Sequence, residues 1–133
     1  MSRKLYNKLV RSEIPTIIRE SGRECIYGVL TVKDNKDEII KLLKEKLVEE
    51  ANEVLEAKHR GDVLEEMGDL YSVYYELKYL MEAGRDIDTI IDAKAIQKGR
   101  FCVLTDDNGK PVEKCNSGTP TYYKLIAVDD NEK

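Results

Sequence analysis

The sequence predicts an all-α protein, an antiparallel helical bundle with a small C-terminal β appendage. Charged residues make up 36% of the 133-residue chain and aromatic residues 7%, with no Trp, which is more typical of amphipathic helices than of a β-sandwich. Apolar residues recur at helical spacing over much of residues 36–98. The acidic stretch of residues 49–69 has the symmetry expected of two antiparallel helices.

The first part of the chain predicts one short helix and one extended segment. Ser12 followed by Pro15 indicates a helix start, and Ser21-Gly22 indicates its end near Glu20. This helix is expected to pack its isoleucines on the core. Residues 24–33 are rich in β-branched and aromatic residues, so they predict an extended segment or a short strand. Asp34-Asn35 then offers an N-cap for the next helix.

Two long helices are predicted over about residues 36–58 and 62–83. The apolar stripe of the first contains Glu50, three residues after Leu47 and four before Val54. The stripe of the second contains Glu66, three residues after Val63 and four before Leu70. A buried, unpaired carboxylate costs several kcal/mol, so ordinary solvated glutamates avoid such positions. Tyrosines on the second helix indicate core or a subunit interface: Tyr71, Tyr74, Tyr75 and Tyr79.

The remainder of the chain predicts a fourth helix and a β appendage. Gly84 is expected to end the preceding helix, Asp86 or Asp88 to cap a helix over about 87–98, and Gly99 to stop it. Asn108-Gly109 predicts a turn between two strands within residues 101–115, and residues 119–130 supply a third. We expect residues 1–101 to form the core and residues 102–133 an extension of the same domain.

The acidic residues at both ends of the 49–69 stretch predict a metal site. A chain reversal midway between residues 59 and 60 sets Glu53 opposite Glu66 and Glu50 opposite Asp69. Within each helix a spacing of three residues places the pair on one face. Four converging carboxylates repel one another, and a hard divalent cation removes this cost. Oxygen ligands without His or Cys favour Mg²⁺, with Mn²⁺ as the second choice.

Charge and cysteine content exclude several classes of protein. The net charge of −4 does not suit a general nucleic-acid binder. Cys25, Cys102 and Cys115 are odd in number and lack C-x-x-C spacing, which favours a reducing, cytoplasmic location. The apolar runs fall short of the roughly 18 residues that span a membrane, so no membrane association is expected. The N-terminal residues are too polar for a signal peptide.

These motifs resemble a known enzyme superfamily over about residues 5–101. Glu49-Glu50-x-x-Glu53, twelve intervening residues, and Glu66-x-x-Asp69 are similar to the signature of the all-α nucleoside triphosphate pyrophosphohydrolases. YNKLVRSEIP resembles the opening YNKLVRDKIP of a MazG-like, phosphoribosyl-ATP pyrophosphohydrolase-like branch, with Ser12 and Glu13 in place of Asp and Lys. Lys94 and the run Lys98-Gly99-Arg100-Phe101 resemble, more loosely, the family's closing Lys and Arg-Gly-Gly-Phe.

The resemblance implies a four-helix MazG-like bundle that assembles as a homodimer or homotetramer. It also implies Mg²⁺-dependent hydrolysis of an NTP or dNTP between the α and β phosphates, yielding monophosphate and pyrophosphate, with a role in cleaning the nucleotide pool. Carried over by position, the implied metal ligands are Glu50, Glu53, Glu66 and Asp69. Glu49 would orient or deprotonate the attacking water, and it lies about 100° round the helix from Glu50. Candidates for phosphate binding are Lys8, Arg11, Lys94 and Lys98.

Other interpretations remain open at the level of sequence. The substrate could be phosphoribosyl-ATP, or the chain could be a non-catalytic helical oligomerisation or binding module that retains a metal site. Glu49 argues against the module, because structural Mg²⁺ binding does not need it. Lys8 and Arg11 could be surface charges or ion-pair partners, and lysines such as Lys94 and Lys98 are favourable near a helix C-terminus in any case.

Overall fold

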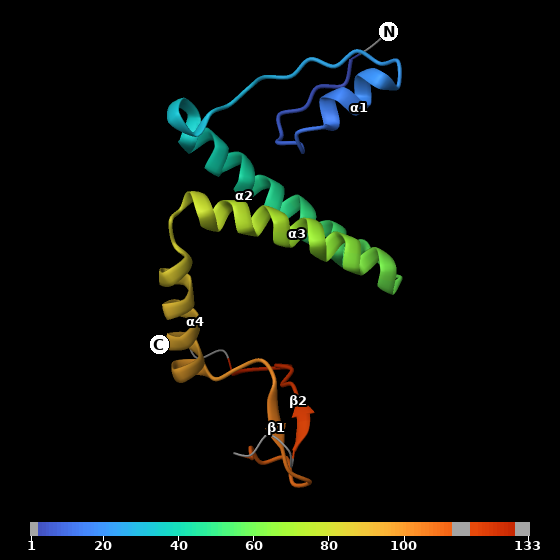
Figure 1. Cartoon of the computed structure of the whole chain (residues 1–133). Coiled ribbons are helices and arrows are strands. Elements are labelled where there is room, and N and C mark those ends of the chain that lie inside the picture. Colours follow the sequence, from blue (N-terminus) through green and yellow to red (C-terminus); the bar gives the residue numbers. More distant parts are fainter. Residues whose placement is uncertain (1–2, 113–117, 130–133) are drawn as a thin grey trace. The chain divides into compact units, whose positions relative to one another are not determined.

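The chain is mostly helical, with a small two-stranded sheet near its C-terminal end (Figure 1). The computed structural model describes residues 3–112 and 118–129. These residues fall into two compact units that divide between Gly84 and Arg85. The boundary therefore precedes most of the fourth helix, whereas the sequence analysis placed the start of an extension after residue 101. The predicted combination of helices with a small β element is confirmed.

The N-terminal unit begins with an irregular basic segment and a short helix, α1 (Ile14–Glu20). Pro15 lies in the first turn of α1, as predicted, and Gly22 follows the helix with a φ of 86°. The expectation that all three isoleucines of α1 pack on the core is wrong for Ile17, whose exposed fraction is 55%. Ile14 and Ile18 are half-buried.

The predicted extended segment at residues 24–33 forms no strand. It lacks regular structure up to Thr31, and Ile26 and Val29 are each 78% exposed. The physical reason is the lack of a neighbour, since β-branched residues form a strand only where another strand pairs with their backbone. The segment instead leads into a helix capped by Thr31, whose hydroxyl accepts a hydrogen bond from the Asp34 amide at 3.2 Å.

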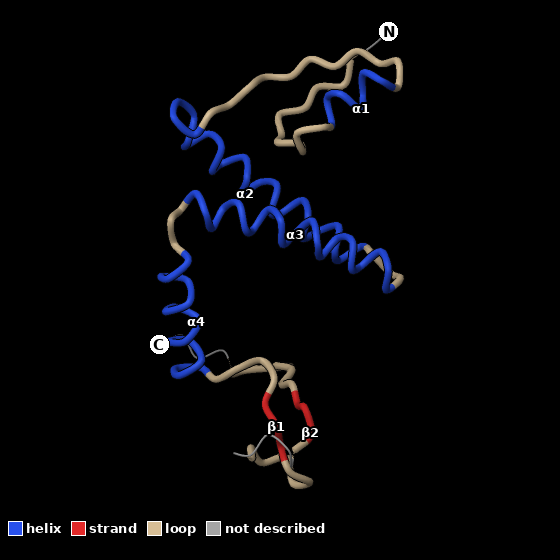
Figure 2. Tube along the Cα trace, in the orientation of Figure 1, coloured by secondary structure: helices blue, strands red, loops and turns tan. Residues whose placement is uncertain are grey.

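Two long helices, α2 (Val32–Glu56) and α3 (Arg60–Leu80), pack against each other in the N-terminal unit (Figures 1 and 2). Asn35 has a non-helical conformation, so the uninterrupted part of α2 follows it, close to the predicted start at residue 36. His59 lies at the reversal as the N-cap of α3. Leu42 and Leu43 on α2 are the buried hydrophobic residues of the described chain. The predicted helical hairpin is thus present.

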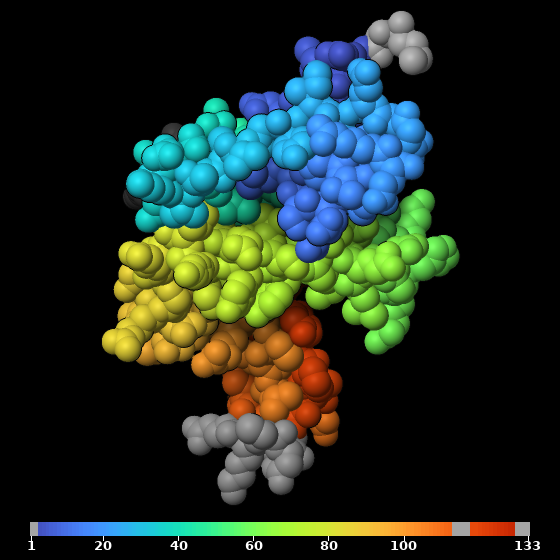
Figure 3. Space-filling model, turned by 45° about the horizontal axis from the view of Figure 1, so that its top comes forward, coloured from blue at the N-terminus to red at the C-terminus, as the bar shows by residue number. Residues whose placement is uncertain are grey.

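The N-terminal segment lies against this hairpin, as the space-filling view shows (Figure 3). Lys8 makes an ion pair with α2, and Arg11 makes one with α3. Two residues only three positions apart therefore connect the segment to both helices.

The C-terminal unit contains nearly all of the fourth helix, α4 (Gly84–Lys98). The prediction that Gly84 ends the preceding helix is wrong. α3 ends at Leu80, Glu82 adopts the left-handed conformation with a φ of 52°, and Gly84 is the first residue of α4. Gly99 stops α4 as predicted, with a φ of 81° that suits a residue without a Cβ.

The β appendage consists of β1 (Val103–Thr105) and β2 (Thr119–Thr121), paired antiparallel with Leu104 opposite Pro120. The predicted Asn108-Gly109 turn follows β1 and returns the chain to an isolated bridge between Thr105 and Pro111. The second predicted strand extends into residues 113–117, which lie outside the described residues together with Cys115. A search of the helices in the described ranges finds none that is long and apolar enough to span a bilayer.

Candidate metal centre

Buried acidic residues face each other between α2 and α3. Glu50 has an exposed fraction of 6%, because it occupies the apolar stripe of α2 between Leu47 and Val54. Glu53 is one turn further along the same helix, and Glu66 faces it from α3; both are half-buried. The helical periodicity of each sequence segment thus directs carboxylates to the interior of the hairpin.

Three of the predicted ligands form one cluster. Glu50, Glu53 and Glu66 each contribute a carboxylate oxygen, and these three oxygens lie within 4.8 Å of one another. Glu50 Oε2 and Glu66 Oε2 are buried and have no hydrogen-bond partner in the structure. Unpaired buried acceptors are rare because each costs about 1–3 kcal/mol, and more when charged. A ligand that accepts electron pairs from oxygen would remove this cost.

The pKa values of two of these carboxyl groups are raised above their ordinary range. For Glu50 the main cause of the raised pKa is burial, and its hydrogen bond with Glu53 adds to it. For Glu53 the main cause of the raised pKa is its hydrogen bond with Glu66. Burial and the neighbouring carboxylates therefore both disfavour ionisation of Glu50 and Glu53 when no cation is bound.

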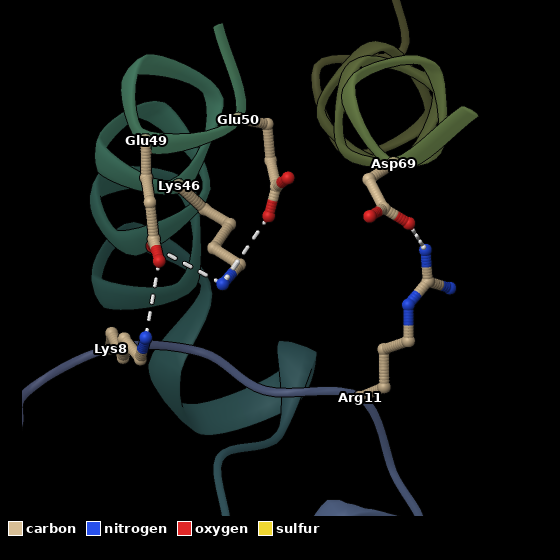
Figure 4. A network of polar contacts seen from close by, with 6 residues as sticks. All are labelled: Lys8, Arg11, Lys46, Glu49, Glu50 and Asp69. Atoms are coloured by element: carbon tan, nitrogen blue, oxygen red, sulfur yellow. Dashed lines mark hydrogen bonds and ion pairs between the residues drawn. The ribbon is translucent and has the colours of Figure 1, made fainter. Parts of the chain in front are cut away.

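Glu49 lies beside the cluster in a different environment (Figure 4). Its Oε1 accepts a hydrogen bond from Lys8 Nζ at 3.1 Å, and its Oε2 accepts one from Lys46 Nζ at 3.2 Å. The hydrogen bond from Lys8 is the largest cause of a lowered pKa at Glu49, although partial burial opposes it. The structure thus separates Glu49, which pairs with two ammonium groups, from Glu50, Glu53 and Glu66, whose carboxylate oxygens lie close to one another.

Asp69 is placed on α3 as predicted but is not part of the three-residue cluster. Its Oδ1 accepts a hydrogen bond from Arg11 at 2.8 Å, which turns the carboxylate toward the N-terminal segment (Figure 4). Glu50 and Asp69 extend from facing helices in this view, as the predicted pairing requires. Because Arg11 binds Oδ1, Asp69 would act as a fourth ligand through Oδ2 or after release of Arg11.

The sequence analysis missed Lys46. Its side chain is only 19% exposed, and its ammonium lies 3.2 Å from Glu49 and 3.5 Å from Glu50. The signal was present in the sequence, because Lys46 precedes the two glutamates by three and four residues, and such residues share a helix face. This spacing predicts a counter-charge for the acidic residues within the same helix.

The remaining candidates, Lys94 and Lys98, are exposed residues of α4 in the C-terminal unit. Their contact with a substrate phosphate stays a prediction. By contrast, Lys8 pairs with the carboxylate of Glu49, and Arg11 pairs with the carboxylate of Asp69.

The donor set of the cluster fits a hard divalent cation. All three groups offer carboxylate oxygen, and no His or Cys belongs to this cluster of described residues. The three carboxylate oxygens lie within 4.8 Å of one another, so side-chain rotation would bring them onto one small ion. Waters or Asp69 would complete its octahedral shell.

Comparison of the chain with protein-family models, with curated proteins and with solved structures gave no match. The resemblance to the MazG-like enzymes therefore rests on the acidic motifs, the N-terminal segment and the looser match of Lys94 and residues 98–101.

Proposed function

We propose that this protein is a Mg²⁺-dependent nucleotide pyrophosphohydrolase that converts an NTP or dNTP to the monophosphate and pyrophosphate. The observation that carries the proposal is the cluster of buried Glu50 with half-buried Glu53 and Glu66, in which Glu50 Oε2 and Glu66 Oε2 are buried and have no partner. A protein gains no stability from such an arrangement unless a cation binds there. The resemblance of the acidic motifs to those of the MazG-like enzymes implies a nucleoside triphosphate as the molecule that this cation would recruit.

The metal-binding residues in the proposal are Glu50, Glu53, Glu66 and Asp69. When bound, Mg²⁺ offsets the negative charge of the phosphates and acidifies a coordinated water. The carboxylates of α2 and α3 would hold the ion, and the packing of these two helices sets the spacing of the ligands.

Glu49 is the proposed general base. The hydrogen bonds from Lys8 and Lys46 lower its pKa, so the group is a carboxylate at neutral pH, and its acceptance of a proton depends on a cation that would acidify the attacking water. The water oxygen forms a bond to the α-phosphorus, the bond from that phosphorus to the bridging oxygen breaks, and pyrophosphate leaves. Lys8 and Lys46 orient the Glu49 carboxylate through one hydrogen bond to each of its oxygens.

Basic residues supply the proposed phosphate contacts. Lys8 and Arg11 belong to the exposed N-terminal segment and reach the acidic residues of both helices. Exposed ion pairs contribute about 0–1 kcal/mol each, so a triphosphate can take over these cations at little cost. Lys94 and Lys98 of α4 are included on the basis of the resemblance.

A homodimer or homotetramer, built on a four-helix MazG-like bundle, is part of the proposal. α3 exposes apolar residues at intervals of three or four positions, with exposed fractions between 47% and 67%: Leu64, Met67, Tyr71, Tyr75 and Tyr79. Leu42 and Leu43 alone are a small buried core for the described residues. Pairing with a second copy would bury this exposed face.

Turnover assays test the function directly. Purified protein is incubated with each NTP and dNTP and with Mg²⁺, and the monophosphate and pyrophosphate are followed by chromatography. The proposal predicts equal amounts of the two products and no turnover after removal of Mg²⁺ with a chelator. Orthophosphate without pyrophosphate would show that a different bond is cleaved.

The same assay separates the alternatives. Turnover confined to phosphoribosyl-ATP would assign the chain to that reaction. Normal metal binding without turnover of any nucleotide would favour a non-catalytic module.

A further inference from the structure

Lys46 occupies the boundary between the proposed base and the proposed metal ligands. It lies one turn before Glu49 and Glu50 on α2, and its ammonium is 3.2 Å from Glu49 Oε2 and 3.5 Å from Glu50 Oε1 (Figure 4). Its side chain is 19% exposed, compared with 41% for Lys8. The Lys46 side chain is therefore largely buried in the helix hairpin, where two carboxylates hold its ammonium.

The contact divides the two oxygens of Glu50 between different partners. Oε1 pairs with Lys46, whereas Oε2 is buried without a partner beside Glu53 and Glu66. An ammonium group carries three donors and no acceptor, so it is able to hold Glu49 and Glu50 together. A divalent cation at the cluster and the ammonium of Lys46 would attract the same Glu50 carboxylate and repel each other.

We propose that Lys46 is a positioning residue that fixes the Glu49 carboxylate at the edge of the metal site and competes with the metal for Glu50. This inference rests on the proposed function. It has two consequences of opposite sign. Loss of the Lys46 charge strengthens metal binding, because a nearby positive charge disappears. The same loss slows turnover, because Glu49 is then held by Lys8 alone.

The test uses Lys46→Met in the full-length chain. Methionine retains most of the aliphatic length, so the packing along α2 is preserved while the charge is removed. Lys44→Met is the matched control, since Lys44 is an exposed lysine on the same helix and its loss changes the net charge equally. Circular dichroism checks the helical content of both variants.

Two independent readouts are required. Binding of Mn²⁺, measured by electron paramagnetic resonance in the absence of nucleotide, should tighten about three- to tenfold in Lys46→Met and by less than about twofold in Lys44→Met. The kcat should fall by about tenfold or more in Lys46→Met with little change in KM. Lys46→Arg, which keeps the charge, should return the Mn²⁺ affinity to that of the wild type and recover part of kcat.

The outcomes distinguish this inference from the proposed function. Weaker or unchanged Mn²⁺ binding in Lys46→Met, or a kcat equal to that of Lys44→Met, overturns the role of Lys46. If Lys46→Met does not fold, Lys46→Gln provides the same comparison with a polar side chain. A wild-type chain that binds Mn²⁺ but turns over no nucleotide overturns the proposed function alone, and the Mn²⁺ measurement still decides whether Lys46 competes with the metal.

Discussion

Replacement of Glu50 by Met should make the metal-free protein more stable and abolish its stabilisation by metal. Glu50 is 6% exposed, and its Oε2 has no hydrogen-bond partner. Methionine is similar in length, is unbranched and needs no partner in an apolar stripe. Lys46 keeps an acceptor in the variant, because its hydrogen bond to Glu49 at 3.2 Å does not involve Glu50.

The expected change in the free energy of unfolding of Glu50→Met follows from two opposing contributions. An unpartnered buried acceptor costs about 1–3 kcal/mol, and its removal is a gain for Glu50→Met. Loss of the Lys46–Glu50 ion pair costs roughly 1 kcal/mol, less than a fully broken buried pair, because Lys46 keeps its contact with Glu49 at 3.2 Å. We therefore expect the free energy of unfolding in EDTA to rise by about 1 kcal/mol, which corresponds to roughly 4 °C in Tm.

The pH dependence has a defined sign. Folding raises the pKa of Glu50 above its ordinary value of 4.5. This shift contributes stability that is fully present below about pH 4.5 and is lost as the pH rises through the raised pKa. The difference in the free energy of unfolding between Glu50→Met and the wild type should accordingly grow from pH 4 toward neutrality, because only the wild type loses this stability.

Urea unfolding followed by circular dichroism measures the effect at one fixed protein concentration, with EDTA or with Mg²⁺. At a Mg²⁺ concentration of about 100 Kd the wild type should gain about 2.7 kcal/mol, and the variant should gain little, so the order of stability reverses. Glu45→Met, an exposed position on α2, is the control and should stay within about 0.5 kcal/mol of the wild type. A variant less stable than the wild type in EDTA would refute the reasoning, because Glu50 would then be a net stabilising residue without metal.

Further predictions concern catalysis, pH and assembly. Glu49→Gln should lower kcat by about 10²–10⁴-fold while Mn²⁺ affinity, measured by calorimetry, changes by less than about threefold; a large loss of metal binding would make Glu49 a ligand instead. Lys8→Met removes the main cause of the lowered pKa of Glu49 in the nucleotide-free chain, so the acidic limb of the kcat/KM–pH profile, which reports the free enzyme, should move to higher pH; an unmoved limb would contradict the assignment of the base. Mn²⁺ binding should weaken as pH falls, because Glu50 and Glu53 have raised pKa values and protons then compete with the metal; titration calorimetry from neutral to acidic pH measures this. Tyr71→Lys places a charge on the exposed face of α3 and should reduce the mass measured by light scattering, whereas an unchanged oligomer would exclude this face as the interface.

Local sequence signals predicted where each helix lies, to within a few residues. Pro15 and Gly99 mark the beginning of α1 and the end of α4, because each acts through its own backbone restrictions. The apolar periodicity predicted α2 and α3 to within a few residues. One local signal misled, because Gly84 begins α4 and does not end α3. Another signal depended on a distant partner, because the strand-like composition of residues 24–33 finds no neighbouring strand.

The acidic cluster was also accessible to sequence reasoning. The positions of Glu50 and Glu66 within apolar stripes implied burial, and the symmetry about the turn paired Glu53 with Glu66. The ion pairs between the N-terminal segment and the two helices could not be predicted from the sequence. Arg11 is 58 residues from Asp69, so periodicity contains no information about their contact.

The sequence by itself determined the helical hairpin and the facing of its carboxylates, because both follow from the period of the α-helix and a single reversal. Only the tertiary structure decided how the acids divide: Glu50, Glu53 and Glu66 share a cluster, while Glu49 and Asp69 pair with cations. The physical reason is that each carboxylate turns toward the nearest opposite charge, and which charge is nearest depends on where the N-terminal segment crosses the helices.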